Sequence, residues 1–344
     1  MAVLSSLRIV REKSSSLPGV DASSLKLTSK FGRNFRLGIL AVAVIAYPLV
    51  SLTLNGPLIK KFPYFQDAEL DLSDRLDKII TEEYERYLRN EKKERKNVVA
   101  RFFRLQNTNV IDSIVKGTIA LKTGVAVALP FYVNFNNRTD VVDYCKRKLK
   151  TFLFCDDAIN VNWDSDIGKN IADTLCLSDN ALRFLVLRDL YSNEQYKSFV
   201  SREVSWVGYS TVACFLTFII HSTSRLRHSL NWFFLILLVS LNLAYFGSEN
   251  WYGVYRHAAD LNADTKAGMS TVSHLEGGKE YYWKLLKRNR LLSSISNCAH
   301  RKVTTCGDIK SLNTPLLKRY LGLKGVRLED DEFIESCIDD FDDE

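Results

Sequence analysis

The two apolar stretches VSWVGYSTVACFLTFII at 204–220 and LNWFFLILLVSLNLAYF at 230–246 decide the fold of this 344-residue chain. Each is seventeen residues long and free of charged side chains, which is about the length of a helix that crosses a bilayer. The nine residues between them, HSTSRLRHS at 221–229, allow only a tight connection, so the pair forms an antiparallel hairpin. The alternative is a buried hairpin in a soluble all-helical core, although soluble helices of this length usually carry a polar face.

A third apolar stretch, LGILAVAVIAYPLVSLTL at 37–54, lies closer to the N-terminus and also lacks charged residues. Its Pro48 is tolerated inside a membrane helix because neighbouring groups can bond to the carbonyl that proline leaves free. The sequence therefore predicts three transmembrane helices in a lipid bilayer, at 37–54, 204–220 and 230–246. The mean hydropathy of −0.10 excludes a transporter built mainly of lipid-facing helices.

Residues 1–36 form a basic leader, in which seven Lys and Arg residues and many serines stand against two acids. An acid-poor leader rich in serine and arginine is typical of a mitochondrial presequence. The alternative is a basic tail on the cytosolic side of another membrane. Basic residues in short segments mark one side of a membrane, so the leader and the turn at 221–229, with Arg225 and Arg227, share that side.

In the mitochondrial inner membrane that side is the matrix. Three spans then place the remaining segments together in the intermembrane space, where they can build one joint soluble domain. These segments are the first part of the domain at 55–203, its second part at 247–328, and an acidic tail at 329–344 that includes the C-terminus.

The formal net charge of +7 combines a strongly basic body with this acidic tail. Residues 329–344 contain ten acids and neither Lys nor Arg, so residues 1–328 carry +17. A basic body often indicates a nucleic-acid partner. Here targeting and orientation account for the charge of the leader and the turn, and the charged run EKKERK at 91–96 lacks the interleaved aromatic residues of a single-strand binder. We therefore predict no nucleic-acid partner.

The soluble segments are predicted to be mainly helical, with a small β element. A charged helix is expected within 67–103, with Ser73 as its N-cap. The stretch 118–135 predicts a buried strand and a turn, and 158–163 predicts a short strand because apolar residues alternate there with polar ones. The predicted fold class is a mainly α membrane protein with a small β element, in which three transmembrane helices accompany a helical soluble domain.

Further helices are predicted on both sides of the hairpin. Ser178 is the expected N-cap of a helix that runs through apolar residues to Leu190. After the hairpin, residues 255–290 predict one or two helices, with a break at Gly277 and Gly278.

The sequence lacks the signals of several common chemistries. No Gly-rich loop is followed by the Lys and Ser or Thr that would cradle a phosphate. The seven cysteines include no C-x-x-C pair, which a zinc ribbon or a copper-relay dithiol needs. No two of the five histidines lie four apart beside a Glu, as a metallopeptidase helix requires. We therefore expect no cofactor, no metal and no enzymatic activity.

Two short pieces of sequence on either side of the hairpin resemble the membrane-embedded zinc peptidases of the HtpX and CAAX-prenyl-protease type. In those enzymes an HExxH helix precedes two spans, and the first acid of a following ExxAD motif is the third zinc ligand. RDLYS at 188–192 and DLNAD at 260–264 stand at the corresponding places. The residues at the degenerate positions are Arg188, Asp189, Ser192, Asp260 and Asp264. A guanidinium has no lone pair to offer zinc and a neutral hydroxyl is a poor ligand, so the resemblance implies an inactive, metal-free site.

Arg188 lies in an otherwise apolar helix, and a buried charge needs a partner. Asp260 and Asp264 follow the hairpin in the next helix. We therefore expect one of these two carboxylates to pair with Arg188 and to link the two helices in place of a metal.

Several longer motifs occur between residues 117 and 290. The most specific is GGKEYYWKLL at 277–286, at a fixed distance behind the hairpin, and the others are GVAVALP at 124–130, Trp163, LCLSDNALRF at 175–184 and the pair of Arg188 and Asp189. In these motifs the chain resembles the transmembrane protein 177 family, in which a Glu usually stands at the place of Asp189. The resemblance does not extend to the long leader or to the acidic tail.

The resemblance implies a mitochondrial inner-membrane protein that takes part in the biogenesis of cytochrome c oxidase. Its implied partners are newly made oxidase subunit 2, the assembly chaperones of that subunit and the copper-delivery proteins that metallate it. No copper-ligand set is evident, so the chain is expected to stabilise the assembly intermediate as a non-enzymatic scaffold. The alternatives are a membrane-bound metallopeptidase-like protein in membrane protein quality control and a membrane protein of unrelated role.

The resemblance also marks a set of family-motif residues as candidate partner contacts. This set comprises Trp163, Gly277, Gly278, Glu280, Tyr281, Tyr282 and Lys284. Simpler roles are available for them, because buried or interfacial aromatic residues usually serve as anchors. Glu280 and Lys284 lie four apart in the order that favours an ion pair on a helix surface.

Overall fold

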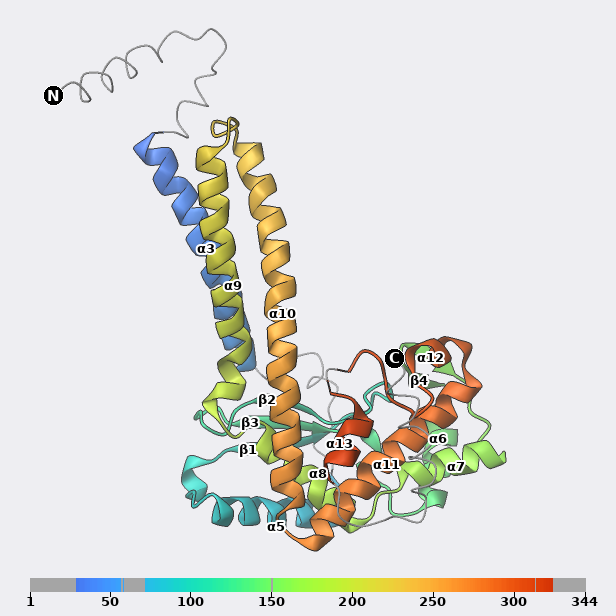
Figure 1. Ribbon diagram of the computed structural model, residues 1–344. Helices are drawn as coiled ribbons and strands as arrows, with labels where there is room; N and C mark the ends of the chain where they lie inside the picture. The colour runs from blue at the N-terminus through green and yellow to red at the C-terminus, as the bar shows by residue number, and fades with distance from the viewer. Residues whose placement is uncertain (1–28, 57, 59–71, 150, 313, 324–344) are drawn as a thin grey trace, which may run out of the picture. The chain divides into compact units, whose positions relative to one another are not determined.

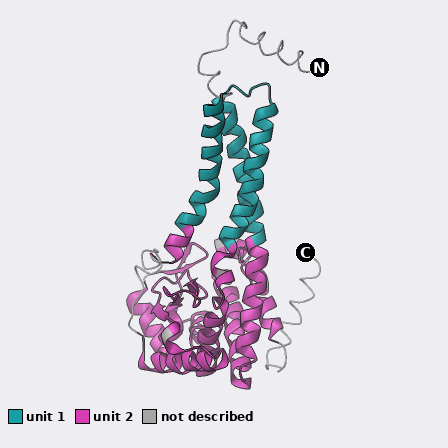
Figure 2. Ribbon diagram, turned by 90° about the vertical axis from the view of Figure 1, so that its left-hand side faces the viewer, with its two compact units in different colours: residues 1–50, 202–251 teal, residues 51–201, 252–344 magenta. Residues whose placement is uncertain are grey.

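The computed structural model describes residues 29–56, 58, 72–149, 151–312 and 314–323. These residues divide into two compact units, which Figure 2 colours separately. The three-helix unit contains the described residues up to Val50 together with Arg202–Trp251, and the mixed unit contains the others. Most of the predicted leader and the whole predicted acidic tail lie outside the described residues.

Three long helices, α3 (Lys30–Asn55), α9 (Tyr196–Thr223) and α10 (Leu230–Gly268), build the three-helix unit and continue beyond it (Figure 1). Each is long and apolar enough to cross a membrane, and each contains one of the three apolar stretches of the sequence. The predicted fold class, mainly helical with three candidate membrane spans, is confirmed. The helices pack on a buried cluster of Leu40, Cys214, Phe233 and Leu237, and many of their other apolar side chains are exposed.

A buried polar contact joins α3 to the hairpin beside the basic turn. Nη1 of Arg36 on α3 donates to Nδ1 of His221 on α9 at 2.6 Å, and Nε2 of His221 donates to the carbonyl oxygen of Ser229 at 3.2 Å. Arginine can only donate, so this contact places the proton of the neutral imidazole on Nε2. One histidine thus connects a guanidinium nitrogen of α3 with a carbonyl oxygen at the start of α10.

A three-stranded sheet lies in the mixed unit, with β3 (Val125–Leu129) between β1 (Ala100–Arg104) and β2 (Ile114–Gly117). β1 runs parallel to β3, and β2 runs antiparallel to it. Every residue of β3 is buried, as expected for a central strand of Val, Ala and Leu. The strand predicted within 118–135 is therefore present and is the middle strand of the sheet.

A separate hairpin pairs β4 (Phe152–Phe154) with β5 (Asp157–Ile159). The two turn residues, Cys155 and Asp156, both have positive φ angles, which is the backbone conformation of a tight two-residue hairpin turn. The strand predicted at 158–163 is therefore shorter than predicted and begins one residue earlier. Alternation of apolar and polar residues continues beyond Ile159, but the three-residue partner β4 offers no further pairing.

Two helices of the mixed unit begin at predicted caps. The Ser73 hydroxyl accepts the backbone N–H of Leu76 at the start of α5 (Asp74–Asn90), and Ser178 does the same for α8 (Asp179–Ser192). The helix predicted within 67–103 ends at Asn90, because a turn, the short helix η3 and β1 follow it within that range. The remaining helices are η3 (Arg95–Asn97), η4 (Phe131–Asn134), α6 (Arg138–Lys148), α7 (Asp166–Leu175), α11 (Val272–Ile295), α12 (Asn297–Lys302) and α13 (Leu316–Gly322).

Helix α8 forms the centre of the mixed unit. From Ala181 to Ser192 every residue except Arg183 is buried, and α8 packs against both α5 and α11. Its apolar residues occupy all faces of the helix, which is typical of a helix that is covered on every side. The pair of Arg188 and Asp189 is thereby carried into the core.

Helix α11 runs without interruption through Gly277 and Gly278, so the predicted break at this pair is wrong. A Cβ on Gly277 would clash with the backbone of Asn180, and a Cβ on Gly278 would lie 2.7 Å from the ring of Phe184. The two glycines therefore allow α11 to approach α8 closely. Close packing compensates for the helix propensity that glycine lacks.

Candidate functional site

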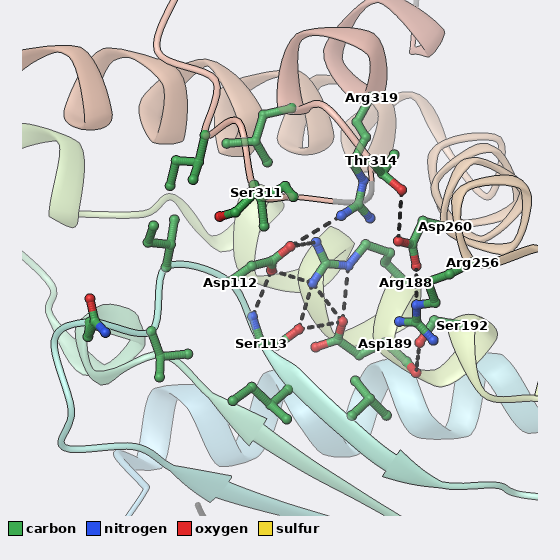
Figure 3. Close-up of a pocket in the computed structure, with 18 of the residues that line it drawn as sticks. Asp112, Ser113, Arg188, Asp189, Ser192, Arg256, Asp260, Ser311, Thr314 and Arg319 are labelled. Atoms are coloured by element: carbon green, nitrogen blue, oxygen red, sulfur yellow. Dashed lines mark hydrogen bonds and ion pairs between the residues drawn. The ribbon is translucent and has the colours of Figure 1, made fainter. Parts of the chain in front are cut away.

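A cavity of about 510 Å³ lies in the mixed unit beside the last turns of α8 (Figure 3). Its walls are formed by residues of the segment 107–115, by the end of α8, by Arg256 and Asp260 of α10, by the β4–β5 turn and by Ile309, Ser311, Leu312, Thr314, Leu316 and Arg319. Three arginines and four aspartates line it. Most of these charges belong to one connected network of ion pairs.

Arg188 lies at the centre of this network and is 3% exposed. Its guanidinium forms a two-pronged pair with Asp112, from Nη1 to Oδ2 at 3.1 Å and from Nη2 to Oδ1 at 2.7 Å. Nε and Nη2 also donate to Oδ1 of Asp189, at 3.0 and 2.7 Å. The hydroxyls of Ser113 and Tyr282 accept from Nη2 and Nη1 at 2.7 and 3.1 Å. All three guanidinium nitrogens are therefore engaged.

Arg319 of α13 enters the same network through Asp264 of α10. Its Nε and Nη2 donate to the two oxygens of Asp264 at 2.7 and 2.8 Å, and its Nη1 donates to Oδ2 of Asp112 at 3.2 Å. The hydroxyls of Tyr281 and Tyr282 donate to Asp112 and to Asp264, both at 2.6 Å. We call Asp112, Arg188, Asp189, Asp264 and Arg319 the Arg188 cluster.

The Arg188 cluster contains two cations and three carboxyl groups, so one carboxyl group is surplus. Burial alone would raise the pKa of Asp112, but the guanidinium groups of Arg188 and Arg319 outweigh burial and hold that pKa well below its usual range. Burial raises the pKa of Asp189 above its ordinary value, and Arg188 offsets only part of this effect. The contrast identifies Asp189 as the surplus acid.

One oxygen of Asp189 has no partner. Oδ1 accepts from Arg188 and from the hydroxyl of Ser113, the latter at 2.7 Å. Oδ2 has no hydrogen-bond partner among the described residues, although the side chain is only 2% exposed. A buried carboxyl oxygen without a donor is unfavourable, and Asp189 is one of the residues that line the cavity.

The prediction that Asp260 or Asp264 pairs with Arg188 is wrong. Asp264 pairs with Arg319, and Asp260 pairs with Arg256 at 3.0 Å while it accepts from the hydroxyl of Thr314 at 3.1 Å. Arg188 takes Asp112 instead, because that residue presents both carboxylate oxygens to the guanidinium fork. The helices before and after the hairpin are linked indirectly, through the hydroxyl of Tyr282.

The degenerate peptidase-like positions do come together. Arg188, Asp189, Ser192 and Asp260 line the one cavity, and Asp264 is bonded to Arg319 in its wall. The Ser192 hydroxyl donates to the carbonyl oxygen of Asp189 at 3.1 Å. Within the described residues, no group of three or more His, Cys, Asp and Glu is arranged to hold a metal ion.

The family-motif residues do not line the cavity, and all of them except Trp163 belong to α11. The predicted ion pair of Glu280 and Lys284 is present at 2.7 Å, but it does more than bridge one helix turn. Glu280 accepts the backbone N–H and the hydroxyl of Ser178, and Lys284 donates to the carbonyl oxygen of Cys176 at 2.6 Å. Glu280 therefore attaches α11 to the N-cap of α8, and Lys284 attaches it to the C-cap of α7.

The aromatic members of the motif are core residues. Tyr281 and Tyr282 are fully buried, with hydroxyls committed to Asp112 and Asp264. Trp163 is 8% exposed and packs near the ring of Phe152. The simpler prediction of buried anchors thus describes their positions.

Sequence reasoning missed Asp112, Ser113 and Arg319. The first two lie in a loop before β2, and Arg319 lies in a helix of seven residues. None belongs to a spacing motif. The signal that could have found them is the charge of Arg188 itself, because a buried arginine in an apolar helix requires more acceptors than one neighbouring aspartate supplies.

The chain has three helices that are long and apolar enough to cross a bilayer, and it also has a mixed unit with a buried charge cluster. These features place it among multi-pass membrane proteins. Within this class it belongs to the Transmembrane protein 177 family, whose sequence profile matches residues 27–341. The chain is 36% identical over 314 residues to the uncharacterized protein R144.12 of Caenorhabditis elegans, an alignment that covers 90% of this chain and 94% of the relative. No solved structure matches the chain.

Proposed function

We propose that the protein is a non-enzymatic scaffold of the mitochondrial inner membrane, which stabilises newly made cytochrome c oxidase subunit 2 and its chaperones during assembly of the oxidase. The observation that carries the proposal is the match to the Transmembrane protein 177 family over nearly the whole chain. The assembly chaperones and copper-delivery proteins of subunit 2 are the further partners that we propose.

The charge distribution supports the location and the orientation. The leader at 1–36 is basic, acid-poor and rich in serine, and the turn at 221–229 carries Arg225 and Arg227 without an acid. Basic segments of this length favour the matrix side of the inner membrane. With α3, α9 and α10 as spans, the mixed unit and the C-terminus then face the intermembrane space, where the copper site of subunit 2 is assembled.

The geometry of α8 supports a role without peptidase chemistry. Arg188 and Ser192 stand where the resembled peptidases carry histidines, and Arg188 is fully committed to carboxylates and hydroxyls. A guanidinium cannot ligate zinc, and removing this one would leave the buried Asp189 and the half-buried Asp112 without their main cation. Stoichiometric zinc in the purified protein would contradict this part of the proposal.

Affinity capture tests the proposed partner. Mitochondrial translation products are pulse-labelled in cells that carry the tagged chain, membranes are solubilised in a mild detergent, and labelled proteins are recovered through a C-terminal tag. We expect subunit 2 to be enriched over the other labelled products. Equal recovery of all labelled products, or recovery no better than with an equally tagged unrelated three-span inner-membrane protein, rejects the partner.

A stability assay tests the function itself. Loss of the chain is expected to shorten the lifetime of labelled subunit 2 during a chase, without a comparable effect on the other mitochondrial translation products. Re-expression of the wild-type chain restores the lifetime, and so does the surface variant Arg147→Ala, whose side chain is 79% exposed. An unchanged lifetime of subunit 2 contradicts the scaffold role.

Protease treatment tests the orientation. In mitoplasts, from which the outer membrane has been opened, a C-terminal tag is expected to be digested while a matrix marker is protected. Protection of the tag until the inner membrane is dissolved would place the mixed unit in the matrix and reverse the proposed topology.

A further inference from the structure

We propose that the basic end of the three-helix unit binds the phosphate group of an anionic phospholipid, and that Arg36 is the innermost residue of this site. The basic end consists of the described residues Lys30, Arg33, Arg36, Arg225 and Arg227. The proposal requires only that α3, α9 and α10 cross a bilayer, which their length and composition allow. It does not depend on the proposed scaffold function or on the compartment that the basic end faces.

The basic end lies at one boundary of the membrane. Arg36, His221 and Ser229 each stand directly next to one of the three charge-free apolar stretches, and hydrogen bonds join them in that order (Figure 1). Trp232 adds an amphipathic ring at the same end, with Nε1 donating to the hydroxyl of Ser224 at 3.1 Å. Because the apolar stretches fill the hydrocarbon layer, residues at their ends lie among the lipid headgroups, where the phosphates are.

The two ends of the three-helix unit differ in how their cations are paired. At the other end Arg202 donates to Glu249 from Nε and Nη2, at 3.0 and 2.7 Å. At the basic end such a partner is missing from the described residues, because neither 29–56 nor 204–248 contains Asp or Glu. The basic end therefore carries five cations and no acid within the part of the chain that the structure describes.

Arg36 is the cation that most needs a negative partner, because only 6% of it is exposed. Its Nη1 donates to His221, a neutral imidazole, and its Cζ lies 5.6 Å from the ring centroid of Phe218. Neither neighbour carries a negative charge. A buried charge without an opposite charge nearby is unfavourable, and ionisable residues beside a membrane-spanning segment usually mark a functional site.

The phosphate is expected to bind where the donors are open. Nε of Arg36 is enclosed, but Nη2 is not, and Nη2 makes no hydrogen bond within the described residues. Arg33, one turn earlier on α3, and the two arginines of the turn at 221–229 are exposed. A guanidinium can bind two phosphate oxygens at once, so Arg33 and Arg36 suit a phosphate better than lysines would.

The surface below the basic end suits acyl chains. Leu37 and Ile220 are the neighbours of Arg36 and His221 on the apolar side, and each is 46% exposed. A phospholipid whose phosphate binds at the basic end would lay its chains over these residues. Inorganic phosphate would gain nothing from them, so the combination of open arginine donors and exposed aliphatic side chains favours a phospholipid.

Thermophoresis of the full chain in non-ionic detergent measures the dissociation constant of each probe. The anionic probe is dioleoyl phosphatidylglycerol in mixed micelles. Dioleoyl phosphatidylcholine has the same acyl chains but balances its phosphate with a choline cation, and inorganic phosphate represents the free anion. We expect phosphatidylglycerol to bind about tenfold more tightly than phosphatidylcholine, because each basic residue near the headgroup adds attraction. Equal binding of the two lipids, or displacement of phosphatidylglycerol by inorganic phosphate at the same concentration, overturns the proposal.

Matched variants locate the lipid. Arg36→Gln is expected to weaken the binding of phosphatidylglycerol about tenfold, and Arg33→Gln about fivefold. Arg202→Gln, at the end where the arginine already has Glu249, is the control and should leave the affinity unchanged. Arg33 is exposed, so its variant is expected to keep the wild-type melting temperature and tests the site even if Arg36→Gln fails to fold. Unchanged affinity in Arg33→Gln, or an equal loss in Arg202→Gln, overturns the assignment.

Acids of the leader are the alternative partners of Arg36. Residues 1–28 lie outside the described residues and contain Glu12 and Asp21. The double variant Glu12→Gln and Asp21→Asn removes both acids, and we expect it to bind phosphatidylglycerol with the affinity of the wild type. Tighter binding would show that the acids of the leader occupy the basic end, which would overturn the lipid as its ligand.

Discussion

Two buried charge clusters connect the helices of the mixed unit, and they differ in how completely their acids are paired. The Arg188 cluster joins α8 to α10, α13 and the loop before β2. A second group, which we call the Glu83 cluster, joins α5 to α8 and α11 and consists of Glu83, Arg86, Arg183 and His274.

In the Glu83 cluster both oxygens of the central carboxylate are paired. Oε1 of Glu83 accepts from Arg183 at 2.9 Å, and Oε2 accepts from His274 at 2.9 Å and lies 3.0 Å from Nε of Arg86. Burial would raise the pKa of Glu83, but the hydrogen bond from His274 and the nearby arginines together lower it. Asp189, by contrast, keeps a raised pKa and an unpaired oxygen.

The difference teaches that burial of a charge is not by itself a sign of function. A carboxylate with every oxygen paired, such as Glu83, is explained by the packing of the helices that it joins. An equally buried carboxyl group with one oxygen left over, such as Asp189 at the wall of a cavity, is not explained by packing. Four substitutions test this distinction.

The largest effect is expected from Arg188→Ala, which leaves the buried Asp189 and the half-buried Asp112 without their main cation. Breaking a buried pair from one side costs about 3–5 kcal/mol of stability, so the free energy of unfolding should fall by about that amount. Denaturant unfolding of the full chain in detergent measures it, with Arg147→Ala as the exposed control. A melting temperature equal to that of the wild type would show that the cluster is not structural.

Glu83→Gln is expected to cost less, about 1.5–3 kcal/mol, because hydrogen bonds to charged groups are worth that much and Arg183 keeps Glu82 as a partner at 2.5 Å. The lowered pKa of Glu83 stabilises the fold above its ordinary value of 4.5, and this contribution disappears as the pH falls through the lowered pKa. The difference in the free energy of unfolding between the wild type and the variant should therefore become smaller at acidic pH. Glu85→Gln, at a partly exposed position, is the control, and a deficit that is constant with pH contradicts the assignment.

Gly277→Ala tests the close approach of α8 and α11 that both clusters depend on. The new Cβ would meet the carbonyl group of Asn180, so either the helices separate or the fold is strained. Overpacking of this kind costs about 1–3 kcal/mol. Gly322→Ala has open space around its Cβ and is expected to leave the melting temperature unchanged; equal melting temperatures for the two variants would refute the packing role.

Asp189→Asn should have the smallest effect, within about 1 kcal/mol at neutral pH, because it removes the surplus acid and keeps the charge balance of the other four residues. The raised pKa of Asp189 means that its protonated form stabilises the fold below the ordinary value of 3.8, and this contribution is lost as the pH rises through the raised pKa. As the pH falls, the free energy of unfolding of the wild type should therefore increase relative to that of the variant. Asp112→Asn, which takes the shared carboxylate from two arginines, should be clearly less stable at neutral pH, and the opposite order of the two variants would reverse the assignment of the surplus acid.

The sequence predicts the elements of this fold better than their pairing. Ser73 and Ser178 mark helix starts because a cap needs only local hydrogen bonds. The partner of Arg188 could not be predicted in the same way, because Asp112 lies 76 positions away in a loop without a periodic pattern. Gly277 misled for a related reason, since glycine indicates a break locally but serves a close contact with a helix that lies far away in the sequence.

The candidate site could likewise be predicted only in part from the sequence. Arg188, Asp189, Ser192 and Asp260 could be selected from their spacing around the hairpin, and the structure does gather them at one cavity. The Arg188 cluster has one carboxyl group more than it has cations. This surplus depends on Arg319 and Asp112 as well. Such a balance exists only after the chain has folded.

The chain order of the Arg188 cluster bears on how the protein is made. Arg319 bonds to Asp112 across 207 positions, and it lies in α13, the last described helix. A polypeptide that enters its membrane with the N-terminus first therefore presents Asp112 and Asp264 long before their shared cation arrives. A chain cut before α13 would retain one arginine for three aspartates. The charge balance of the cluster therefore depends on the last described helix, because a chain cut before α13 lacks the cation that Asp112 and Asp264 share.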